Sequence, residues 1–288
     1  MSSFVAVLAA LLIGLAPPPP ERIISLSPSV TEILDGVGAF DRVVAVSTYC
    51  EYPEEAKRLP RVGGWTDTNL EQVLALAPDL VILTDAQAPL VDGRLQSLGI
   101  RTLVVGSQSL EDIFEAIESI GEAVGNREEA KRLSDSMRAE LSEISEAVEG
   151  RPRPRTLVVV DRLPGTLRDI YIATEGSYIT SLVEIAGGDP ITPKAAHEYM
   201  QISAEALVAF DPEVVFDIVQ ALNAPVTVPG AGNLAEDPVA VWRTIDIQAV
   251  KDGRIYALSD KRFVHPSQLA IRTAREIATR LHPDAMSP

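Results

Sequence analysis

Short apolar runs, separated by turn residues and amphipathic stretches, follow one another along most of the chain. The runs are rich in β-branched residues and do not alternate strictly with polar positions, which is typical of strands covered on both faces of a sheet. Strands are predicted over residues 22–26, 43–46, 80–83, 102–105, 156–160, 214–217 and 254–258. Helices are predicted to begin near Ser29, Thr68 and Pro89 and to span residues 177–186, 203–210 and 266–281. This succession predicts an α/β fold with mostly parallel central sheets.

One helix–strand segment occurs twice. Residues 69–83, NLEQVLALAPDLVIL, align without a gap with residues 203–217, SAEALVAFDPEVVFD. Each copy begins with a residue suited to cap a helix (Asn69, Ser203), continues as a short amphipathic helix, breaks at proline and an acid, and ends in an apolar strand. Two copies of one unit predict two lobes of the same design.

A long charged segment between the halves carries apolar residues three or four positions apart, the spacing of one helix face. It spans residues 127–149 and ends at Gly150, before Arg-Pro-Arg-Pro. A helix of this length extends about 34 Å, enough to run along both lobes, and should limit their relative motion. The chain is therefore predicted to contain a first lobe at 21–125, a linking helix at 126–150 and a second lobe at 151–288.

The first residues differ from the rest of the chain. Residues 4–16 are apolar and uncharged, too short a run to span a membrane, which takes about 20 residues. Such a run is typical of a secretory signal peptide, although no Lys or Arg precedes it and Pro17 to Pro20 follow it. We expect residues 1–20 to be a signal peptide and proline-rich spacer, and the protein to be exported. No cysteine comes directly after the run, so a lipid anchor is not expected.

Composition excludes several classes of protein. The formal net charge is −16, which opposes binding to nucleic acid or to anionic lipid. The single cysteine, Cys50, excludes an internal disulfide framework and is interpreted as an unpaired loop thiol. An enzyme is the competing class, but the phosphate-binding loop, the HExxH motif and the Gly-x-Ser-x-Gly motif are all missing.

Five segments, in the same order along the chain, resemble a known family. They are RIISLSPSVTEIL, VSTYCEYPEEAKRLPRVGGWTDTNLEQVLALAPDLVIL, YIATEGSYITSLVEIAGG, EYMQISAEAL and AVKDGRIYALSD. Over about residues 21–283 the chain is similar to the periplasmic binding proteins in which two Rossmann-like lobes are joined by one rigid helix. That family binds cobalamin, ferric siderophores or haem in the cleft between the lobes, and the cobalamin-binding branch is the most similar.

The resemblance implies a partner and a location. It implies a solute-binding protein that delivers cobalamin to the permease dimer of an ABC importer in the cytoplasmic membrane. A monomer is expected, in the periplasm or at the extracellular face of that membrane. The same fold binding haem or a ferric siderophore is the alternative, and a direct metal-ion binder or a sensor domain without a transporter ranks lower.

Aromatic residues are the main candidates for ligand contact. Ligands of α/β sheets bind at the loops after the carboxyl ends of strands, and Tyr49, Trp65, Tyr171 and Tyr199 are expected in such loops. By resemblance they occupy positions where cobalamin-binding proteins place aromatic contacts. Their flat surfaces suit a planar macrocycle, although each could instead be an ordinary, partly buried aromatic residue. Trp242, by contrast, is interpreted as a core residue.

Polar candidates follow from the same resemblance. Asp260 matches a carboxylate that accepts hydrogen bonds from ligand amides. The arginine that the family has in the next Pro-x-Arg segment is missing, since this chain has Pro266, Ser267 and Gln268 there. Arg262 is the candidate replacement, with a solvated charge as its alternative. Where the family often has a bulky aromatic residue or arginine, this chain has Thr84, Asp85 and Gln87.

Two acids occupy equivalent places in the repeat. Glu71 and Glu205 each lie two residues after the capping residue. In the family this pair of carboxylates binds arginine pockets on the two permease subunits, so each lobe is expected to present one docking charge. The alternative is local, because an acid in the first turn of a helix is favourable there.

Metal chemistry has little support in the sequence. The chain has three histidines, of which His197 and His265 are weak candidates to line the cleft as metal ligands. A haem-binding protein would need an axial ligand, which Tyr49, Tyr199 or His197 could supply. His282, near the end of the chain, is expected at the surface.

Overall fold

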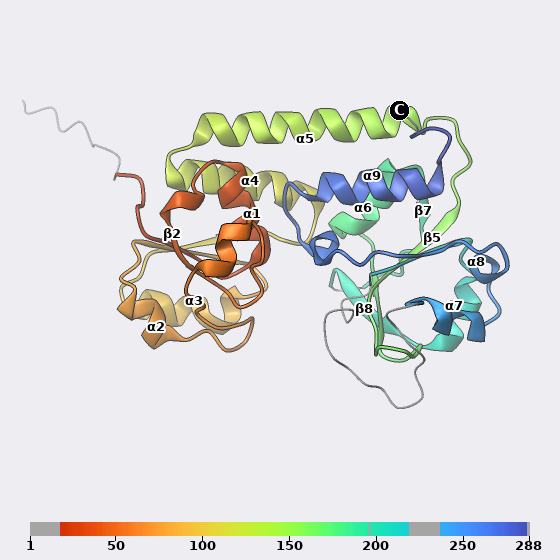
Figure 1. Ribbon diagram of the computed structural model, residues 1–288, viewed down its shortest axis with the longest axis horizontal. Coiled ribbons are helices and arrows are strands. Elements are labelled where there is room, and N and C mark those ends of the chain that lie inside the picture. The colour runs from red at the N-terminus through yellow and green to blue at the C-terminus, as the bar shows by residue number, and fades with distance from the viewer. Residues whose placement is uncertain (1–17, 196, 219–236, 287–288) are drawn as a thin grey trace, which may run out of the picture.

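The computed structural model describes residues 18–195, 197–218 and 237–286. It contains two α/β lobes side by side, with one long helix running across the top of both (Figure 1). The apolar run at 4–16 lies outside the described residues. Within the described ranges, no helix combines the length and the hydropathy that crossing a membrane requires.

The first lobe has an all-parallel sheet in the order β2-β1-β3-β4. Its strands are β1 (Ile23–Ser25), β2 (Val43–Val46), β3 (Leu80–Thr84) and β4 (Thr102–Val105). Its helices are α1 (Pro28–Gly36), α2 (Leu70–Ala75), α3 (Ala88–Ser97) and α4 (Leu110–Val124), with short 3₁₀ turns η1 (Phe40–Arg42) and η2 (Glu54–Arg58).

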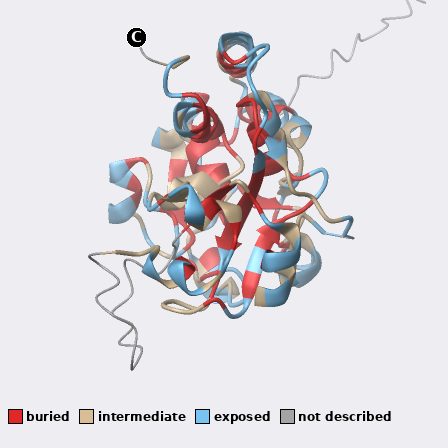
Figure 2. Ribbon diagram, turned by 90° about the vertical axis from the view of Figure 1, so that its right-hand side faces the viewer, coloured by how far each residue is buried: buried red, intermediate tan, exposed pale blue. Residues whose placement is uncertain are grey.

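Both faces of this first sheet are covered. Ile23, Leu80 and Ile82 belong to one buried cluster, and their neighbours Ile24 and Val81 belong to another on the opposite face. Successive strand residues point to opposite faces, so both sets must be apolar. This explains the unbroken apolar runs in the sequence, and Figure 2 shows the buried residues concentrated in the strands and the inner sides of helices.

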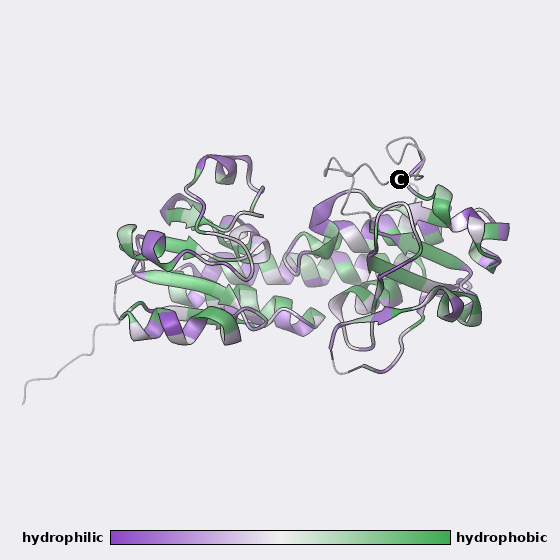
Figure 3. Cartoon of the chain, turned by 90° about the horizontal axis from the view of Figure 1, so that it is seen from below, coloured by the Kyte–Doolittle hydropathy of each residue, from purple (hydrophilic) through white to green (hydrophobic). Residues whose placement is uncertain are grey.

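The second lobe has a mixed sheet in the order β10-β9-β5-β6-β8, with β7 also paired to β5. The strands β10, β9 and β5 are parallel, whereas β6 is antiparallel to both β5 and β8. Figure 3 shows the hydrophobic strands at the centre of each lobe. The strands are β5 (Arg155–Asp161), β6 (Ile170–Ala173), β7 (Asp189–Pro190), β8 (Tyr199–Ile202), β9 (Val214–Asp217) and β10 (Ile255–Ala257). The helical segments are α6 (Tyr178–Ile185), α7 (Ala204–Phe210), η4 (Ala240–Thr244), α8 (Gln248–Lys251), η5 (Lys261–Val264) and α9 (Ala270–Leu281).

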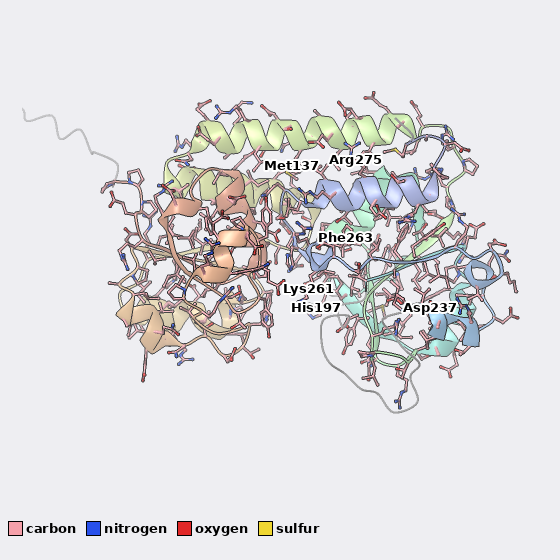
Figure 4. All side chains as sticks on the ribbon, in the orientation of Figure 1. Met137, His197, Asp237, Lys261, Phe263 and Arg275 are labelled. Carbon is pink, nitrogen blue, oxygen red and sulfur yellow. The ribbon has the colours of Figure 1, made fainter. Side chains whose placement is uncertain are left out.

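The long helix α5 (Arg127–Ala147) follows the predicted position closely. It packs against α1 and α4 of the first lobe and against α6 and α9 of the second. Its buried side chains, including Met137 near its middle (Figure 4), join one hydrophobic cluster that also contains Ile33 of α1 and Ile277 of α9. One continuous core therefore connects both lobes through α5.

Several local predictions need correction. The last helix begins at Ala270 rather than near 266, because η5 and an extended turn precede it. His282 is buried, with its Nε2 3.2 Å from the carbonyl oxygen of Gly187, so the surface prediction is wrong. Trp242 is fully buried, which confirms its interpretation as core. Cys50 is free and buried.

Candidate ligand cleft and docking helices

A cavity of about 660 Å³ lies between the two lobes. This volume is within the usual range for small-molecule sites, about 300–1,000 Å³. Its walls come from strand residues of both sheets and from loops that follow strands, near where α/β sheets place ligands. The first lobe contributes Ser27, Pro28, Ser29, Tyr49, Glu51, Trp65, Thr84, Ala86 and Ser107. The second contributes Val160, Asp161, Tyr171, Glu198, Tyr199, Lys261, Val264, His265 and Pro266.

All four predicted aromatic residues line this cavity. Tyr49, Trp65 and Tyr171 are 60%, 42% and 39% exposed, so their rings are accessible rather than packed in the core. Burial and the nearby negative charge of Glu198 raise the pKa of Tyr199 to about 12. Its hydroxyl is therefore protonated at neutral pH and able to donate a hydrogen bond.

The first-lobe aromatics are positioned by two glycines. Gly63 has a φ of 98°, a conformation that side chains with a Cβ rarely adopt. A Cβ on Gly64 would meet Cε2 of Tyr49 at 3.1 Å, so the missing side chain leaves room for the tyrosine ring. The Gly-Gly pair thus brings Tyr49 close to the loop that carries Trp65.

The second-lobe aromatics lie on the two antiparallel strands that the sequence patterns did not reveal. Tyr199 of β8 is directly opposite Ala173 of β6, and opposite residues project from the same face of a sheet. Tyr171 is two residues from Ala173 along β6 and therefore shares that face. The antiparallel pair thus places both tyrosines side by side on the cleft wall.

Asp260 and Arg262 lie beside the main cavity rather than in its wall. They line an adjoining cavity of about 440 Å³, which shares Tyr49, Glu51, Lys261 and His265 with the main one. Nε of Arg262 donates to both carboxylate oxygens of Asp260, at 2.8 and 2.9 Å. The guanidinium of Arg262 holds the pKa of Asp260 below its usual value. Asp260 is thus already satisfied by a positive charge from its own loop.

Lys261, between these two residues, connects the lobes. Its Nζ lies 3.3 Å from Oε1 of Glu51 in the first lobe, and Figure 4 shows Lys261 and His197 at the boundary between the lobes. His197 is exposed and lies outside the described cavity wall. Among the residues that the structure describes, no three His, Cys, Asp or Glu side chains are grouped to hold a metal ion.

A buried carboxylate forms a second contact between the lobes. Glu32 of α1 is 1% exposed, and its Oε1 lies 2.7 Å from Nδ1 of His265 in the second lobe. Its other oxygen accepts a hydrogen bond from the Ser267 hydroxyl. Its backbone oxygen accepts one from Nε2 of Gln268 at 2.6 Å. The residues that stand where the family has Pro-x-Arg therefore fasten the second lobe to α1.

Thr84, Asp85 and Gln87, which stand where the family often has a bulky aromatic residue or arginine, have a structural role as well. Gln87 is fully buried. Its Nε2 donates to the carbonyl of Leu26 at 2.9 Å, and its Oε1 accepts from the backbone N–H of Thr84 at 3.3 Å. Asp85 accepts a hydrogen bond of 2.6 Å from the Ser107 hydroxyl. These polar bonds tie the loops after β1, β3 and β4 together, and only small side chains, Thr84 and Ala86, face the cavity from this segment.

The two predicted docking acids are exposed and occupy matching positions. The side chain of Asn69 accepts from the N–H of Gln72, and that of Ser203 accepts from the N–H of Ala206, so both helices have the predicted caps. Glu71 and Glu205 follow as the second residues of α2 and α7. A hydrogen bond from the side chain of Ser203 and one from the backbone N–H of Glu205 itself lower the pKa of the Glu205 carboxyl. Both side chains are exposed at the first turn of their helices, where a partner can reach them.

An arginine at or just before a strand binds the C-terminal end of each of these two helices. Nη2 of Arg22, just before β1, donates to the carbonyl of Leu76 at 2.6 Å. Nη1 of Arg155, at the start of β5, donates to the carbonyl of Asp211 at 3.2 Å, and its Nη2 binds the carbonyl of Phe210. Nε of Arg22 also donates to the carbonyl of Ala77. In the alignment of the two segments, Leu76 and Ala77 correspond to Phe210 and Asp211, so the two arginines bind equivalent carbonyl groups. Each lobe therefore holds the end of its exposed helix with one arginine.

Comparison with known proteins agrees with this architecture. The family described as "Periplasmic binding protein" matches residues 23–261. An uncharacterized ABC transporter substrate-binding lipoprotein, YvrC of Bacillus subtilis, is 29% identical over 92% of this chain and 81% of its own length. The vitamin B12-binding protein of Vibrio cholerae is 26% identical over 92% of this chain and 90% of its own length.

Solved structures give the same result. The periplasmic vitamin B12 binding protein BtuF of Vibrio cholerae superposes with a TM-score of 0.76 at 26% identity, covering 94% of this chain and all of that one. A periplasmic heme binding protein from Pseudomonas aeruginosa has a TM-score of 0.76 at 23% identity, over 92% of this chain and 94% of its own. The two lobes, the connecting helix and the match over residues 23–261 show that the chain belongs to the periplasmic binding protein family.

Proposed function

We propose that this protein is the solute-binding subunit of an ABC importer, exported from the cytoplasm, and that it binds a corrinoid of the cobalamin type between its lobes. The observation that carries the proposal is the cavity of about 660 Å³ with Tyr49 and Trp65 on one side and Tyr171 and Tyr199 on the other. Accessible aromatic rings from both lobes suit a large, flat ligand, because they bury much area with little loss of rotamer freedom.

Cobalamin is favoured by the polar groups around the rings. A corrin carries amide side chains, which need both donors and acceptors. The protonated hydroxyl of Tyr199 is a donor in the wall, and the carboxylates of Asp161 and Glu198 are acceptors there. The adjoining cavity, lined by Glu51, Lys261 and other charged residues, offers space for a polar extension of the ligand. The relatives at 26–29% identity include proteins named for vitamin B12.

Haem is the second candidate, and His265 is the observation that favours it. His265 lines the cavity and contacts Glu32 through Nδ1, an arrangement in which a carboxylate orients an imidazole for a metal. Tyr199 is the weaker axial candidate, because a pKa of about 12 opposes the phenolate form that binds iron.

The test is a calorimetric titration of residues 21–288 with cyanocobalamin, with haem and a ferric siderophore in parallel. We expect saturable one-to-one binding of cyanocobalamin, weakened about 30-fold or more by Trp65→Ala, as for a buried aromatic anchor. Leu98→Ala is the matched control, since Leu98 is 44% exposed and lies outside the cavity. Binding of haem alone, lost in His265→Ala, would replace the ligand. Silence with all three would refute the proposed ligand class.

Delivery to the importer is the second part of the proposal. We infer that the protein acts as a monomer, and that Glu71 and Glu205 bind cationic pockets on the two permease subunits. Each helix is antiparallel to the strand that follows it, so its N-terminal acid lies toward the carboxyl edge of the sheet, the edge that forms the cleft. A partner that binds both acids would therefore sit near the cleft opening. Glu71→Gln with Glu205→Gln should preserve ligand binding but weaken docking, and unchanged docking would refute this role.

A further inference from the structure

The two exposed helices match each other beyond their acids. Residue by residue, 70–75 of α2 and 204–209 of α7 have the same sequence of burial classes, with one buried residue in each, Val73 and Leu207. After each helix a non-glycine residue adopts a left-handed conformation, Ala77 with φ 44° and Asp211 with φ 43°. The backbone and its exposure are thus repeated together on the two lobes.

An exposed aliphatic side chain lies three residues after each acid. Leu74 is 43% exposed and Val208 is 47% exposed. Residues three apart lie on the same face of a helix, so Leu74 is beside Glu71 and Val208 beside Glu205. The next exposed residue in each helix is an alanine, Ala75 and Ala209, which extends the apolar surface.

Single exposed aliphatic residues are ordinary on protein surfaces, and the first lobe also exposes Leu90, Leu98 and Val104. Leu74 and Val208 differ from these in occupying equivalent positions of the repeat. In the described part of the second lobe, Val208 is the single large aliphatic side chain with this degree of exposure, and the aromatic Tyr171 faces the cleft. Its first-lobe counterpart, counted by the repeat, is again a large exposed aliphatic. An exposed hydrophobic residue kept at equivalent positions in both lobes suggests a shared partner rather than chance exposure.

We propose that Glu71 with Leu74, and Glu205 with Val208, form two equivalent docking patches, each combining one charge with one apolar contact. The inference rests on the proposed function, because the occupant is the pair of related membrane subunits of the importer. Charge complementarity points to that occupant: the chain carries a net charge of −16, so each facing subunit should present a cationic group beside an apolar depression. The acids would direct encounter and orientation, and the aliphatic side chains would slow dissociation by burial on contact.

The two patches are held at a fixed distance from each other. Arg22 and Arg155, here called the arginine clamps, bind the C-terminal ends of α2 and α7 beside the sheets. Helix α5 also packs against both lobes in one core. In Figure 1, α2 and α7 lie on different lobes, both on the side away from α5. The spacing between patches is therefore set by the fold, which suits a partner with two fixed, related surfaces.

The test measures how the cyanocobalamin-loaded protein binds its importer in lipid nanodiscs, at low and at high salt. Leu74→Ser and Val208→Ser should each weaken docking about tenfold at both salt concentrations, because apolar burial is not screened. Glu71→Gln and Glu205→Gln should weaken it mainly at low salt. Leu98→Ser is the control: it is equally exposed but lies before β4, at the opposite edge of the sheet. Unchanged ligand titration shows that each variant is folded, and Leu74→Ala and Val208→Ala serve if a serine variant is not.

The possible outcomes separate three claims: the apolar contacts, the equivalence of the two patches, and the docking role itself. If the two serine variants dock like Leu98→Ser while the glutamine variants are weakened, docking depends on charge alone and the apolar patches are wrong. If only one serine variant is weakened, the equivalence of the patches is wrong. If the wild-type chain does not bind the importer at all, the docking part of the proposed function fails with this inference, whereas the ligand titration stands or falls separately.

Discussion

The two lobes are alike at their exposed helices and differ in the buried strands that follow them. α2 and α7 share caps, acids, exposure and an arginine clamp. The strands that follow them end differently: Leu83 of β3 is a buried apolar residue, whereas its counterpart Asp217 of β9 is a buried acid. The repeated unit is thus alike on the exposed helices and differs at a buried position of the following strand, where neither residue lines the described cavity.

The buried acid of the second lobe is held by a network without a counterpart among the described residues of the first. Nε and Nη2 of Arg162 donate to Oδ2 of Asp217 at 2.9 and 2.8 Å, and Nε1 of Trp242 donates to the same oxygen at 2.6 Å. Arg162→Met should lower the free energy of unfolding by about 3–5 kcal/mol, because it leaves a buried charge without its partner. Urea unfolding followed by tryptophan fluorescence measures this.

Restoring the first-lobe arrangement supplies the control for that prediction. Arg162→Met combined with Asp217→Leu removes both charges and should recover part of the lost stability. Recovery should be incomplete, since the indole N–H of Trp242 is left without its acceptor. A double variant no more stable than Arg162→Met would show that the network matters for reasons other than charge burial.

The contact of Glu32 with His265 and Ser267 is expected to restrain the second lobe relative to the first. Glu32→Gln keeps the size of the side chain but replaces one acceptor oxygen by an amide donor, next to the Ser267 hydroxyl that donates to Glu32 and to Nδ1 of His265. We expect a loss of about 1–3 kcal/mol, together with a broader distribution of lobe separations by small-angle scattering. Glu54→Gln is the control, because Glu54 is exposed on η2. If Glu32→Gln left both measurements unchanged, α5 alone would set the lobe orientation.

Much of this architecture follows from sequence patterns, and the exceptions have physical reasons. Strands β2, β4 and β9 appear at their predicted residues because apolar runs bounded by turns define them. The sequence did not predict β6 and β8, because they pair antiparallel and lie outside the helix–strand alternation. Helix α4 is absent from the predicted elements, although the capping box formed by Ser109 and Asp112 is a sequence signal for its start.

The candidate site was predictable to a different degree. The four cleft aromatics were named from the expectation of loops after strand ends and from the family resemblance. Tyr49 and Trp65 do lie in loops. The expectation of loops is wrong for Tyr171 and Tyr199, which lie on β6 and β8.

The roles of Glu32, Gln87 and Gln268 could not be predicted, since each depends on contacts between segments far apart in the chain. The pairing of Asp260 with Arg262 was equally hidden, because sequence proximity does not say whether two charges face each other or a ligand.

The arginine clamps should behave as equivalents. Arg22→Gln and Arg155→Gln each remove charge-assisted hydrogen bonds to helix carbonyls at an exposed site, and each should cost about 1–2 kcal/mol. Hydrogen exchange should accelerate locally, in α2 for the first variant and in α7 for the second, with the other helix unaffected. Arg94→Gln, an exposed arginine of α3, is the control. Unequal effects would show that the two lobes hold their exposed helices differently.

The smallest expected effect concerns the loop of Asp260, which lies outside the repeated segments. The Arg262 guanidinium lowers the pKa of Asp260 in the folded protein, so this pair stabilises the loop above the unfolded pKa of about 3.9 and the benefit is lost as pH falls through the lower folded value. Arg262→Gln should shift the carboxyl titration of Asp260, followed by NMR, upward toward its ordinary range. Lys131→Gln, which affects an exposed pair on α5, should leave it unchanged. If Asp260 titrated identically with and without Arg262, the carboxylate would be free for a ligand amide, and the second lobe would offer the cleft a polar contact that the present geometry withholds.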